Sequence, residues 1–233
     1  MNERPDPNPE TSTPMTARFI TFEGGEGVGK STQIKRLMAN LNRAGVPVVR
    51  TREPGGTPKA EAIRSFILQG RCQDWGPGAE AVLFAAARLD HVKALIAPSL
   101  EAGKWVLSDR FADSTRAYQG LTGGVPDLLI DGLEVLALDG RAPDLTFVMD
   151  MDPTDAFERV ARKAEEEGVP VIKDRFEKET LDWHRKLREG YLEIARRNQG
   201  RCIVIDAGGN EDEIEAKIWA TLSERFAELK AAG

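Results

Sequence analysis

The segment from Gly24 to Ser31 constrains the fold of this chain more than any other part of the sequence. It reads GGEGVGKS, which fits the pattern G-x-x-x-x-G-K-S/T, and it directly follows the apolar run FITF at residues 19–22. Loops of this kind turn consecutive backbone N–H groups toward an anion, and the helix that follows adds the positive end of its dipole. The spacing therefore predicts a strand, a phosphate-binding loop (P-loop) and a helix, built to hold a nucleoside triphosphate.

Lys30 and Ser31 supply the side-chain chemistry of the predicted loop. A lysine at this place reaches the outer phosphates, and the hydroxyl that follows it is a ligand for Mg²⁺. A glycine-rich turn with this lysine and hydroxyl arises by chance in about one chain in a hundred at average residue usage. A dinucleotide-binding loop does not fit, because a Lys-Ser pair has no role in such a loop.

Short apolar runs alternate with longer helical patterns from Arg18 onward. The runs are partly β-branched and bounded by Gly, Pro or charge, as strands are. The predicted strands are residues 19–22, 46–49, 105–107, 145–149 and 202–205. The predicted helices are residues 30–44, 58–69, 78–101, 125–138, 153–166, 175–198 and 211–230. Because the connections between strands contain helices, we expect a parallel sheet in a three-layer α/β/α sandwich, with ligands at the carboxyl ends of the strands.

The chain divides into a short tail and one domain. Residues 1–17 are rich in Pro, Asn, Thr and Glu and have no apolar period, so we expect them to be disordered. Residues 18–233 have a length typical of a single domain. No internal repeat is visible in them, which excludes a solenoid or a repeat array.

The charge balance excludes several classes of partner. The chain has 32 basic and 38 acidic residues and a net charge of −6, so no basic excess indicates nucleic acid or an anionic membrane surface. No apolar run reaches the length of about 18 residues that a membrane span needs, and the N-terminus has no secretory apolar core. We therefore expect a cytoplasmic protein with neither nucleic acid nor a membrane as partner.

Cysteine and histidine are scarce in this sequence. Cys72 and Cys202 are far apart and belong to no CxxC pair, so the sequence indicates buried free thiols rather than a disulfide framework or a zinc cluster. With only His91 and His184, a Ser-His-Asp site is poorly supported. The chemistry must come from Lys, Arg, Asp, Glu and the backbone.

Charged residues also follow other predicted strands. Asp109 ends the segment WVLSD, and an acid at the tip of a strand beside a P-loop holds magnesium directly or through water, although a turn-capping Asp would look the same. Arg110 comes next, and a guanidinium fits between phosphate groups with a bidentate geometry that lysine lacks. Arg52 precedes the turn PGG at residues 54–56 and, taken singly, fits a surface ion pair equally well. Together with Lys30, these strand ends predict a convergent anion site.

Five segments of the sequence, taken together, resemble the thymidylate kinase family. They are GGEGVGKST, TREPGGT, LFAAARLDHV, SDRFADSTRAYQG and PDLTFVMD, and they occur in the order of the family. The resemblance covers residues 18–206 and implies transfer of the γ-phosphoryl group of ATP to dTMP with magnesium, giving dTDP and ADP for dTTP synthesis. It also implies the P-loop kinase fold, with parallel strands in the order 2-3-1-4-5, and a homodimer.

The resemblance assigns roles to individual residues. The residues implied to bind ATP are Gly24, Gly25, Glu26, Gly27, Val28, Gly29, Lys30, Ser31 and Thr32. Those implied to bind dTMP are Arg52 and Arg110 at the phosphate, Glu26 near the sugar, Phe84 and Arg88 at the base, and Ser114, Thr115, Tyr118 and Gln119 closing around base and sugar. Ser31 and Asp109 would hold the magnesium ion. Lys30, Asp109 and Arg110 are thereby also implied to be catalytic.

The helical pattern over residues 78–101 supports the places of Phe84 and Arg88. At about 100° per residue, these two side chains lie together and about 100° away from the centre of an apolar stripe. The stripe consists of Val82, Ala85, Leu89, Val92 and Ile96. An aromatic side chain packed under a loop beside an ion-paired arginine would produce the same pattern.

A phosphoryl transfer must exclude water, which calls for a mobile lid. In the family that the sequence resembles, the arginine that stabilises the transition state comes either from the P-loop, next to the acidic residue, or from the lid. Here Gly27 follows Glu26, so the lid must supply this arginine.

We place the lid at residues 159–175, with Arg162 and Arg175 as catalytic residues and Arg159 as a further candidate. The acidic insertion EEEGVP at residues 165–170 departs from a compact, arginine-rich lid. Each of these arginines also fits the solvated, ion-paired end of a helix.

Two other functions would use the same loop. A kinase for another nucleoside monophosphate or for a deoxynucleoside shares the scaffold, although Phe84 with Arg88 favours a pyrimidine. A nucleotide-dependent switch or partitioning ATPase would use the loop to control a partner. The sequence contains neither NKxD nor LSGGQ and has no second lysine ahead of the glycines. A switch also leaves unexplained why Arg52 and Arg110 converge on a second ligand.

Overall fold

The computed structural model describes residues 16–170 and 174–229, so most of the tail predicted at residues 1–17 lies outside the described residues. The described chain is built around one sheet of five parallel strands in the order β2-β3-β1-β4-β5, which confirms the predicted order. The strands are β1 (Phe19–Glu23), β2 (Val48–Arg52), β3 (Trp105–Asp109), β4 (Leu145–Asp150) and β5 (Cys202–Asp206).

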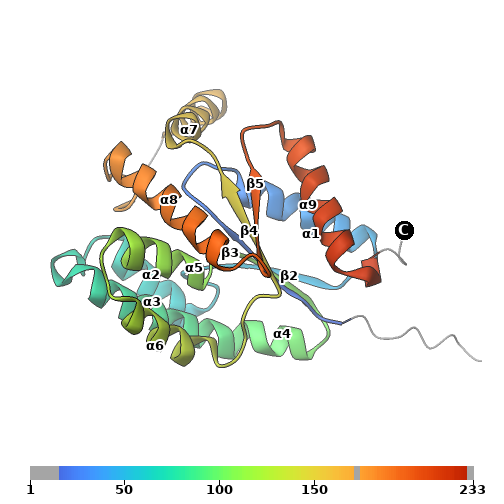
Figure 1. Ribbon diagram of the computed structural model, residues 1–233, viewed down its shortest axis with the longest axis horizontal. Coiled ribbons are helices and arrows are strands. Elements are labelled where there is room, and N and C mark those ends of the chain that lie inside the picture. Colours follow the sequence, from blue (N-terminus) through green and yellow to red (C-terminus); the bar gives the residue numbers. More distant parts are fainter. Residues whose placement is uncertain (1–15, 171–173, 230–233) are drawn as a thin grey trace, which may run out of the picture.

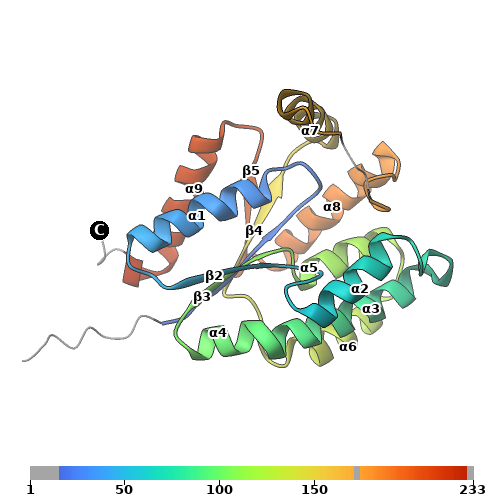
Figure 2. The ribbon, with the colours of Figure 1, turned by 180° about the vertical axis from the view of Figure 1, so that it is seen from behind.

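Helices cover both faces of this sheet, as predicted for a three-layer sandwich (Figure 1 and Figure 2). On one face, α1 (Lys30–Arg43) and α9 (Glu211–Arg225) pack against each other. The helices on the other side are α2 (Pro58–Leu68), α3 (Gly76–His91), α4 (Ala97–Glu101), α5 (Ala112–Thr115), α6 (Asp127–Leu138) and α8 (Leu181–Arg197). Short 3-10 turns lie at Gln73–Trp75 and Ala227–Leu229.

Two π-helical segments extend these helices. The first, Val92–Ile96, joins α3 to α4 without a break, so residues 76–101 form the long helix that the sequence predicts over 78–101. The second, Arg116–Thr122, continues α5. The sequence pattern does not predict this second stretch of helix, which follows β3 and lines the site described below.

The strand β2 begins later than predicted. Residues 46 and 47 connect the turn after α1 to the strand, and the N–H of Val46 still donates back to the carbonyl oxygen of Leu41 over 2.9 Å. Pro47 has no N–H to contribute to a strand, and only its carbonyl oxygen is used, accepting from Trp105 N over 2.8 Å. The apolar run therefore starts before the strand does.

The helix α8 also begins later than the sequence suggests. The side chain of Thr180 accepts a hydrogen bond from Trp183 N and so caps the helix at this point. The residues before it form a turn, in which Asp174 Oδ1 accepts from the N–H groups of Phe176 and Glu177. A carboxylate that binds its own backbone in this way competes with helix formation.

Both faces of the central strands are buried. Ile20 and Phe22 of β1 belong to the core beneath α1 and α9, together with Phe147 of β4. Phe19 and Val106 belong to a core cluster on the opposite side. Strands buried on two faces are nearly continuous apolar runs, which explains why β1 shows no alternation in the sequence.

The buried positions of α3 correct one detail of the predicted stripe. Val82 is 49% exposed, whereas Ala85, Val92 and Ile96 are buried as predicted. The prediction for Val82 is wrong because α3 packs against both α2 and α6, so its buried positions spread around the helix instead of following one line. Arg88, predicted to lie off the core face, is only 4% exposed.

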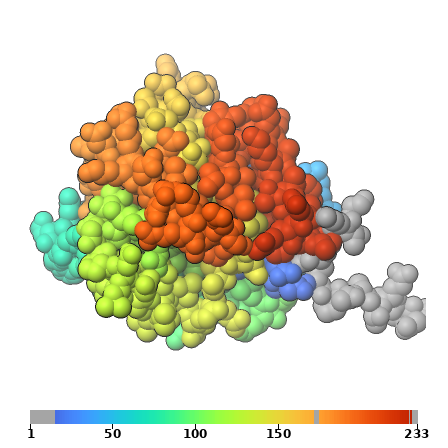
Figure 3. Space-filling model, in the orientation of Figure 1, coloured from blue at the N-terminus to red at the C-terminus, as the bar shows by residue number. Residues whose placement is uncertain are grey.

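The helix α7 (Pro153–Glu167) stands over the carboxyl ends of the strands, where the sequence places the ligand site (Figure 1). It follows β4 directly and is capped by Asp152, whose side chain accepts from Thr154 N over 2.9 Å. In the space-filling view α7, coloured gold, projects at the top of the molecule, above the surface formed by α8 and α9 (Figure 3).

Cys72 and Cys202 are buried and unbonded, which confirms the expectation of free thiols. Among residues 16–170 and 174–229, none of the helices has the length and apolar character needed to cross a membrane.

Candidate active site

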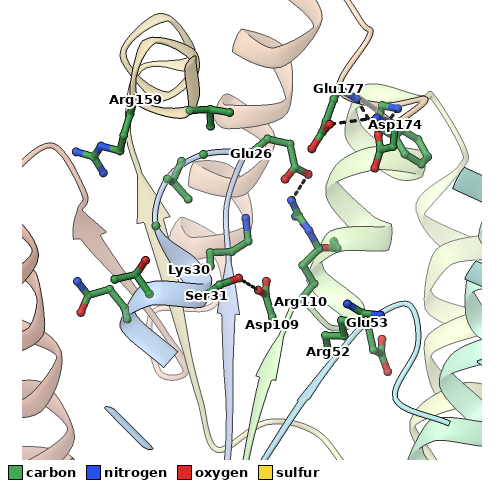
Figure 4. Close-up of a pocket in the computed structure, with 18 of the residues that line it drawn as sticks. Glu26, Lys30, Ser31, Arg52, Glu53, Asp109, Arg110, Arg159, Asp174 and Glu177 are labelled. Carbon is green, nitrogen blue, oxygen red and sulfur yellow. Dashed lines mark hydrogen bonds and ion pairs between the residues drawn. The ribbon is translucent and has the colours of Figure 1, made fainter. Parts of the chain in front are cut away.

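A cavity of about 840 Å³ opens at the carboxyl edge of the sheet, beneath α7 (Figure 4). The P-loop, α7 and the start of α9 form one end, and the ends of β2 and β3 with α3 and α5 form the other. All the residues assigned to the acceptor line it: Glu26, Arg52, Phe84, Arg88, Arg110, Ser114, Thr115, Tyr118 and Gln119. Residues 26–32 of the assigned ATP loop line it as well. Gly24 and Gly25 line a smaller hollow behind the loop.

Lys30 lies at the start of α1, folded back under the P-loop. Its Nζ donates to the carbonyl oxygens of Gly24 and Gly25 over 3.1 Å and 2.5 Å. Burial and the neighbouring Arg110 lower the pKa of Lys30, while Glu26 and other carboxylates oppose this effect. A lysine that uses only backbone carbonyls as acceptors is free to exchange them for phosphate oxygens.

Ser31 and Asp109 are brought together from two different elements. Ser31 Oγ, on α1, donates to Asp109 Oδ2, at the end of β3, over 2.6 Å (Figure 4). Hydroxyl and carboxylate oxygens are hard donors of the kind that Mg²⁺ prefers. The pair is therefore a suitable place for a magnesium ion beside the P-loop.

Arg110 projects from the end of β3 into the middle of the site. Its φ of 70° lies in the left-handed region, which residues other than glycine rarely adopt. Its guanidinium donates to Glu26 Oε1 over 2.5 Å (Figure 4). It also donates to the carbonyl oxygen of Gly24 over 2.9 Å and to Tyr191 Oη over 2.8 Å. These contacts hold the guanidinium against the P-loop.

Glu26 is the carboxylate at the centre of the site. Burial alone would raise the pKa of Glu26, but Arg110, Lys30 and a hydrogen bond from Tyr118 lower it to about 2. Tyr118 Oη donates to the same oxygen, Oε1, over 3.1 Å. Glu26 is therefore ionised throughout the neutral range, and its carboxylate orients Arg110 and Tyr118.

Arg52 lies at the open end of the cavity. Its side chain is 56% exposed and pairs with Glu61 over 3.1 Å, which is the surface ion pair that its position after β2 also allowed. Arg64 lines the same end, and burial together with the charge of Arg52 lowers the pKa of Arg64. Two cationic side chains at one end of a cleft favour an anionic ligand there.

Arg88 belongs to a buried network behind the acceptor end. Its Nε donates to Glu53 Oε2 over 2.7 Å, and its Nη2 donates to the carbonyl oxygen of Phe111 and to Thr115 Oγ1. The other oxygen of Glu53 lies 2.9 Å from His91 Nδ1. The side chains of Arg88, Glu53 and His91 are all at most 4% exposed. The guanidinium of Arg88 is thus fixed before any ligand arrives.

Aromatic side chains line the acceptor end of the cavity together with the arginines. The rings of Phe84 and Phe176 lie 6.3 Å apart, and both residues line the cavity. Tyr118 contacts Phe176 edge-on at 5.2 Å and Trp183 at 5.5 Å. Flat apolar surfaces of this kind suit the face of a planar base.

Arg175 is not among the described residues that line the cavity. Its guanidinium pairs with Glu80 over 2.7 Å and lies 4.3 Å from the centre of the Phe176 ring. Glu80 also accepts from Gln119 Nε2 over 3.2 Å. Arg175 therefore faces α3 instead of the P-loop.

Arg159 and Arg162, by contrast, line the cavity from α7. Arg159 donates to the carbonyl oxygen of Ala207 over 3.1 Å, and it lies on the other side of the P-loop from Arg110 (Figure 4). Arg162 is 68% exposed and forms an i,i+4 pair with Glu166 at 3.9 Å. Both arginines start from the helix that overhangs the donor end.

Gly27 marks the point where the P-loop touches α7. Its φ is +74°, and a Cβ there would lie 2.6 Å from the carbonyl oxygen of Ala156 and 2.8 Å from Val160 Cγ2. The space beside the loop is thus already occupied by α7, and an arginine has no room at this position. Residues 171–173 of the lid predicted at 159–175 lie outside the described residues.

Several residues that build the site were not singled out from the sequence. They are Glu23, Glu53, Asp174, Phe176, Glu177 and Tyr191. Glu53 lies within the segment TREPGGT, and residues 174–177 form the cluster DRFE, three residues after the acidic insertion at 165–170, so both carried a usable signal. Glu23 and Tyr191 carried none, because an acid after an apolar strand and a tyrosine in an amphipathic helix are ordinary.

Transfer between two nucleotides requires two anion sites that share one cavity. This chain places a P-loop at one end and a cationic, aromatic end opposite, which defines a P-loop nucleotide kinase. The sequence pattern of the family described as thymidylate kinase matches residues 22–218, and the chain belongs to this family.

Curated relatives named thymidylate kinase resemble the chain over nearly its whole length. The protein of Rhodopseudomonas palustris is 49% identical over 210 residues, covering 90% of each chain. The protein of Bradyrhizobium diazoefficiens is 47% identical over 209 residues, with the same coverage. The protein of Nitrobacter winogradskyi is 47% identical over 215 residues, covering 92% of each chain.

Proposed function

We propose that the chain transfers the γ-phosphoryl group of ATP to dTMP, giving dTDP and ADP. The observation that carries the proposal is the position of Arg110, whose guanidinium bonds the P-loop carbonyl of Gly24 and also faces the end lined by Tyr118 and Ser114. A cation at this point serves both of the phosphates that must meet. The name thymidylate kinase is carried by relatives that align with 90% of the chain, and it supports the same function.

At the donor end, the backbone N–H groups of residues 24–32 and the N-terminus of α1 would bind the ATP phosphates. Lys30 would leave its carbonyl acceptors and bind the outer phosphates. Arg159 and the residues at the start of α9 line the remainder of this end.

Ser31 and Asp109 are the residues that would hold magnesium. Their oxygens lie 2.6 Å apart at the phosphate end of the loop, on elements fixed by the sheet. When bound, the ion supplies positive charge to the phosphates of ATP. Ser31 and Asp109 would hold it at the end of the loop where Lys30 also lies.

At the acceptor end, the chain offers separate groups for the phosphate, sugar and base of dTMP. Arg52 and Arg110 would bind the phosphate, and Glu26 would approach the sugar. Phe84 would stack on the thymine ring, and Arg88 would bond a thymine carbonyl. The residues that would close around base and sugar are Ser114, Thr115, Tyr118 and Gln119.

The chemistry needs alignment more than proton transfer. A phosphate oxygen of the acceptor is already anionic near neutral pH, so it attacks without a general base. Glu26, with its pKa lowered to about 2, orients Arg110 and accepts no proton in this range. Lys30 and Arg110 stabilise the charge that develops on the transferring group.

A further arginine should come from the lid, which we propose spans residues 159–175 within the single domain 18–233. Gly27 leaves no room for a P-loop arginine, so the candidates remain Arg159, Arg162 and Arg175. Arg175 would have to release Glu80 before it could reach a phosphate.

Replacing each of these three arginines with alanine tests the lid. At least one substitution is expected to lower kcat by about 10³-fold, as loss of an arginine finger does. Uniformly small losses would overturn the assignment of the transition-state arginine to the lid.

We also propose a homodimer that buries the outer face of α6. The exposed apolar side chains on this face are Leu128 at 86%, Val135 at 80% and Leu136 at 62%. Exposed apolar side chains grouped on one helix are typical of a surface that contacts another protein. Leu128→Arg is expected to convert a dimer into a monomer in sedimentation analysis, and a wild-type chain that sediments as a monomer would contradict this proposal.

The compartment is a proposal too. Cys72 and Cys202 are unbonded thiols, which favours a reducing environment. We infer that the enzyme acts in the cytoplasm.

One measurement tests the proposed reaction as a whole. ADP release from Mg·ATP is followed alone and with dTMP, dUMP, CMP, AMP or thymidine. Strong stimulation by dTMP is the expected result. Stimulation by another monophosphate alone would keep the kinase and overturn the roles of Phe84 and Arg88. Equal turnover with and without every acceptor would favour a nucleotide-dependent switch.

A further inference from the structure

Glu23, the last residue of β1, lies behind the site and is not among the described residues that line the cavity. Its side chain is completely buried. Oε1 accepts from the N–H groups of Phe111 and Ser114 over 2.7 Å and 3.3 Å, and Oε2 accepts from Ser114 Oγ over 2.6 Å. Glu23 thus holds the start of α5, the segment that directly follows Arg110.

Tyr191 connects this carboxyl to Arg110. Its Oη lies 2.8 Å from Arg110 Nη1 and 2.8 Å from Ser114 Oγ. Arginine only donates, so the phenol oxygen accepts from Arg110 and its own O–H points to Ser114 Oγ. The hydroxyl of Ser114 then donates to Glu23. Every proton in this chain of hydrogen bonds has an acceptor when Glu23 is ionised.

We propose that Glu23, acting through Ser114 and Tyr191, is a positioning residue that orients the Arg110 guanidinium for the acceptor phosphate. This inference deepens the proposed function and rests on it, because it concerns how Arg110 is presented to dTMP. The left-handed backbone of Arg110, with φ 70°, persists only where surrounding contacts over-determine it. The hydrogen-bond chain from Glu23 supplies such contacts from the side away from the ligand.

Charged groups surround Glu23. Burial, and then the nearby carboxylate of Asp113, raise the pKa of Glu23 to about 7 against the opposing effect of Arg110. Asp113 is itself paired with Arg201 over 2.6 Å. Further titratable groups that interact with Glu23 among the described residues are Lys30, Tyr191, Arg201 and Cys202. Burial raises the pKa of Tyr191 well above its usual value, so the phenol stays neutral.

Protonation of Glu23 would reverse the chain of hydrogen bonds. A proton on Oε2 donates to Ser114 Oγ, and the serine hydroxyl must then turn to the phenol oxygen. Tyr191 would accept from both Ser114 and Arg110, and its own proton would lose the acceptor it has now. The anchor of Arg110 is therefore weaker below the pKa of Glu23 than above it.

Glu23→Gln tests this arrangement, because the amide keeps the shape of the carboxyl but donates toward Ser114 as the protonated acid does. The KM for dTMP, the KM for ATP and kcat are measured from about pH 6 to about pH 8.5, a window that spans the titration of Glu23. At the alkaline end, the variant is expected to raise the KM for dTMP about three- to tenfold, the range of one hydrogen bond, with the KM for ATP unchanged. The wild type is expected to lose dTMP affinity toward acid pH more steeply than the variant.

Tyr191→Phe removes the shorter link between Ser114 and Arg110 without touching the carboxyl, and it leaves only the 3.3 Å contact of Arg110 Nη1 with Ser114 Oγ. It is expected to raise the KM for dTMP by a similar factor and to remove the extra acid dependence. Glu189→Gln, an exposed change on the same helix, is the matched control and should leave all three parameters as they are.

The results distinguish the loss of the positioning role of Glu23 from the failure of the proposed kinase activity. If both variants keep the wild-type KM for dTMP and its pH profile, or if kcat and both KM values change together, Glu23 has no positioning role. If Glu23→Gln fails to fold, Tyr191→Phe decides the question by the same criteria. A wild-type enzyme that dTMP does not stimulate overturns the proposed function, and this inference with it.

Discussion

The burial of Glu23 links the stability of the fold to pH. The pKa of this carboxyl is raised from 4.5 to about 7, chiefly by burial. As the pH rises above 4.5, the unfolded chain releases this proton while the folded chain retains it, so stability is lost until the pH passes the folded value. The full shift lowers the free energy of unfolding by about 3.4 kcal/mol. About 2.5 kcal/mol of this loss occurs as the pH rises from about 5 to about 8.

Glu23→Gln removes this titration. The free energy of unfolding of the variant, relative to that of the wild type, is therefore expected to rise by about 2.5 kcal/mol from about pH 5 to about pH 8. Urea unfolding of both proteins at each pH measures the difference, in which groups common to both proteins cancel. Glu26 does not interfere with this measurement. Because its pKa is lowered from 4.5 to about 2, its contribution to stability changes with pH only below about pH 4.5. If the difference in free energy of unfolding between the two proteins is the same at both pH values within about 0.5 kcal/mol, the raised pKa of Glu23 is refuted.

Other consequences of the structure can be tested separately. Gly56→Ala is expected to cost about 2–5 kcal/mol in urea unfolding, because φ is +85° and a Cβ would lie 2.5 Å from His91 Nε2; unchanged stability would contradict this crowding. Glu53→Ala leaves Arg88 buried without its carboxylate and should cost about 3–5 kcal/mol, whereas a loss near zero in the same assay would mean that water replaces the pair. Asp109→Asn should raise the magnesium concentration for half-maximal activity about ten- to a hundredfold, and an unchanged requirement would remove Asp109 from the metal site.

The sheet was predictable from the sequence because its evidence is local. Short apolar runs separated by helices predict a parallel sheet, and the resemblance to the thymidylate kinase family implied the order of its strands. The meeting of Ser31 with Asp109 follows from the same logic, since parallel strands end at one edge. The meeting of Ser31 and Asp109 at this edge can therefore be anticipated from the sequence.

Contacts between distant helices were not predictable in this way. The pairing of Arg175 with Glu80 depends on where the turn before α8 lies against α3, and the place of Tyr191 beside Arg110 depends on where α8 lies relative to the end of β3. No periodicity in the sequence encodes either placement. The exposure of Val82 has the same origin, because a helix between two neighbours has no single apolar line. A buried acid such as Glu23 is invisible until its partners are known.

The contact between Gly27 and α7 constrains how such an enzyme can change by mutation. The backbone of α7 occupies the space where a side chain at this position would begin. A substitution of Gly27 by arginine must therefore be accompanied by a displacement of α7, the helix that carries Arg159 and Arg162. An arginine at position 27 and the present position of α7 therefore exclude each other, and an enzyme acquires the one only if the other segment changes with it.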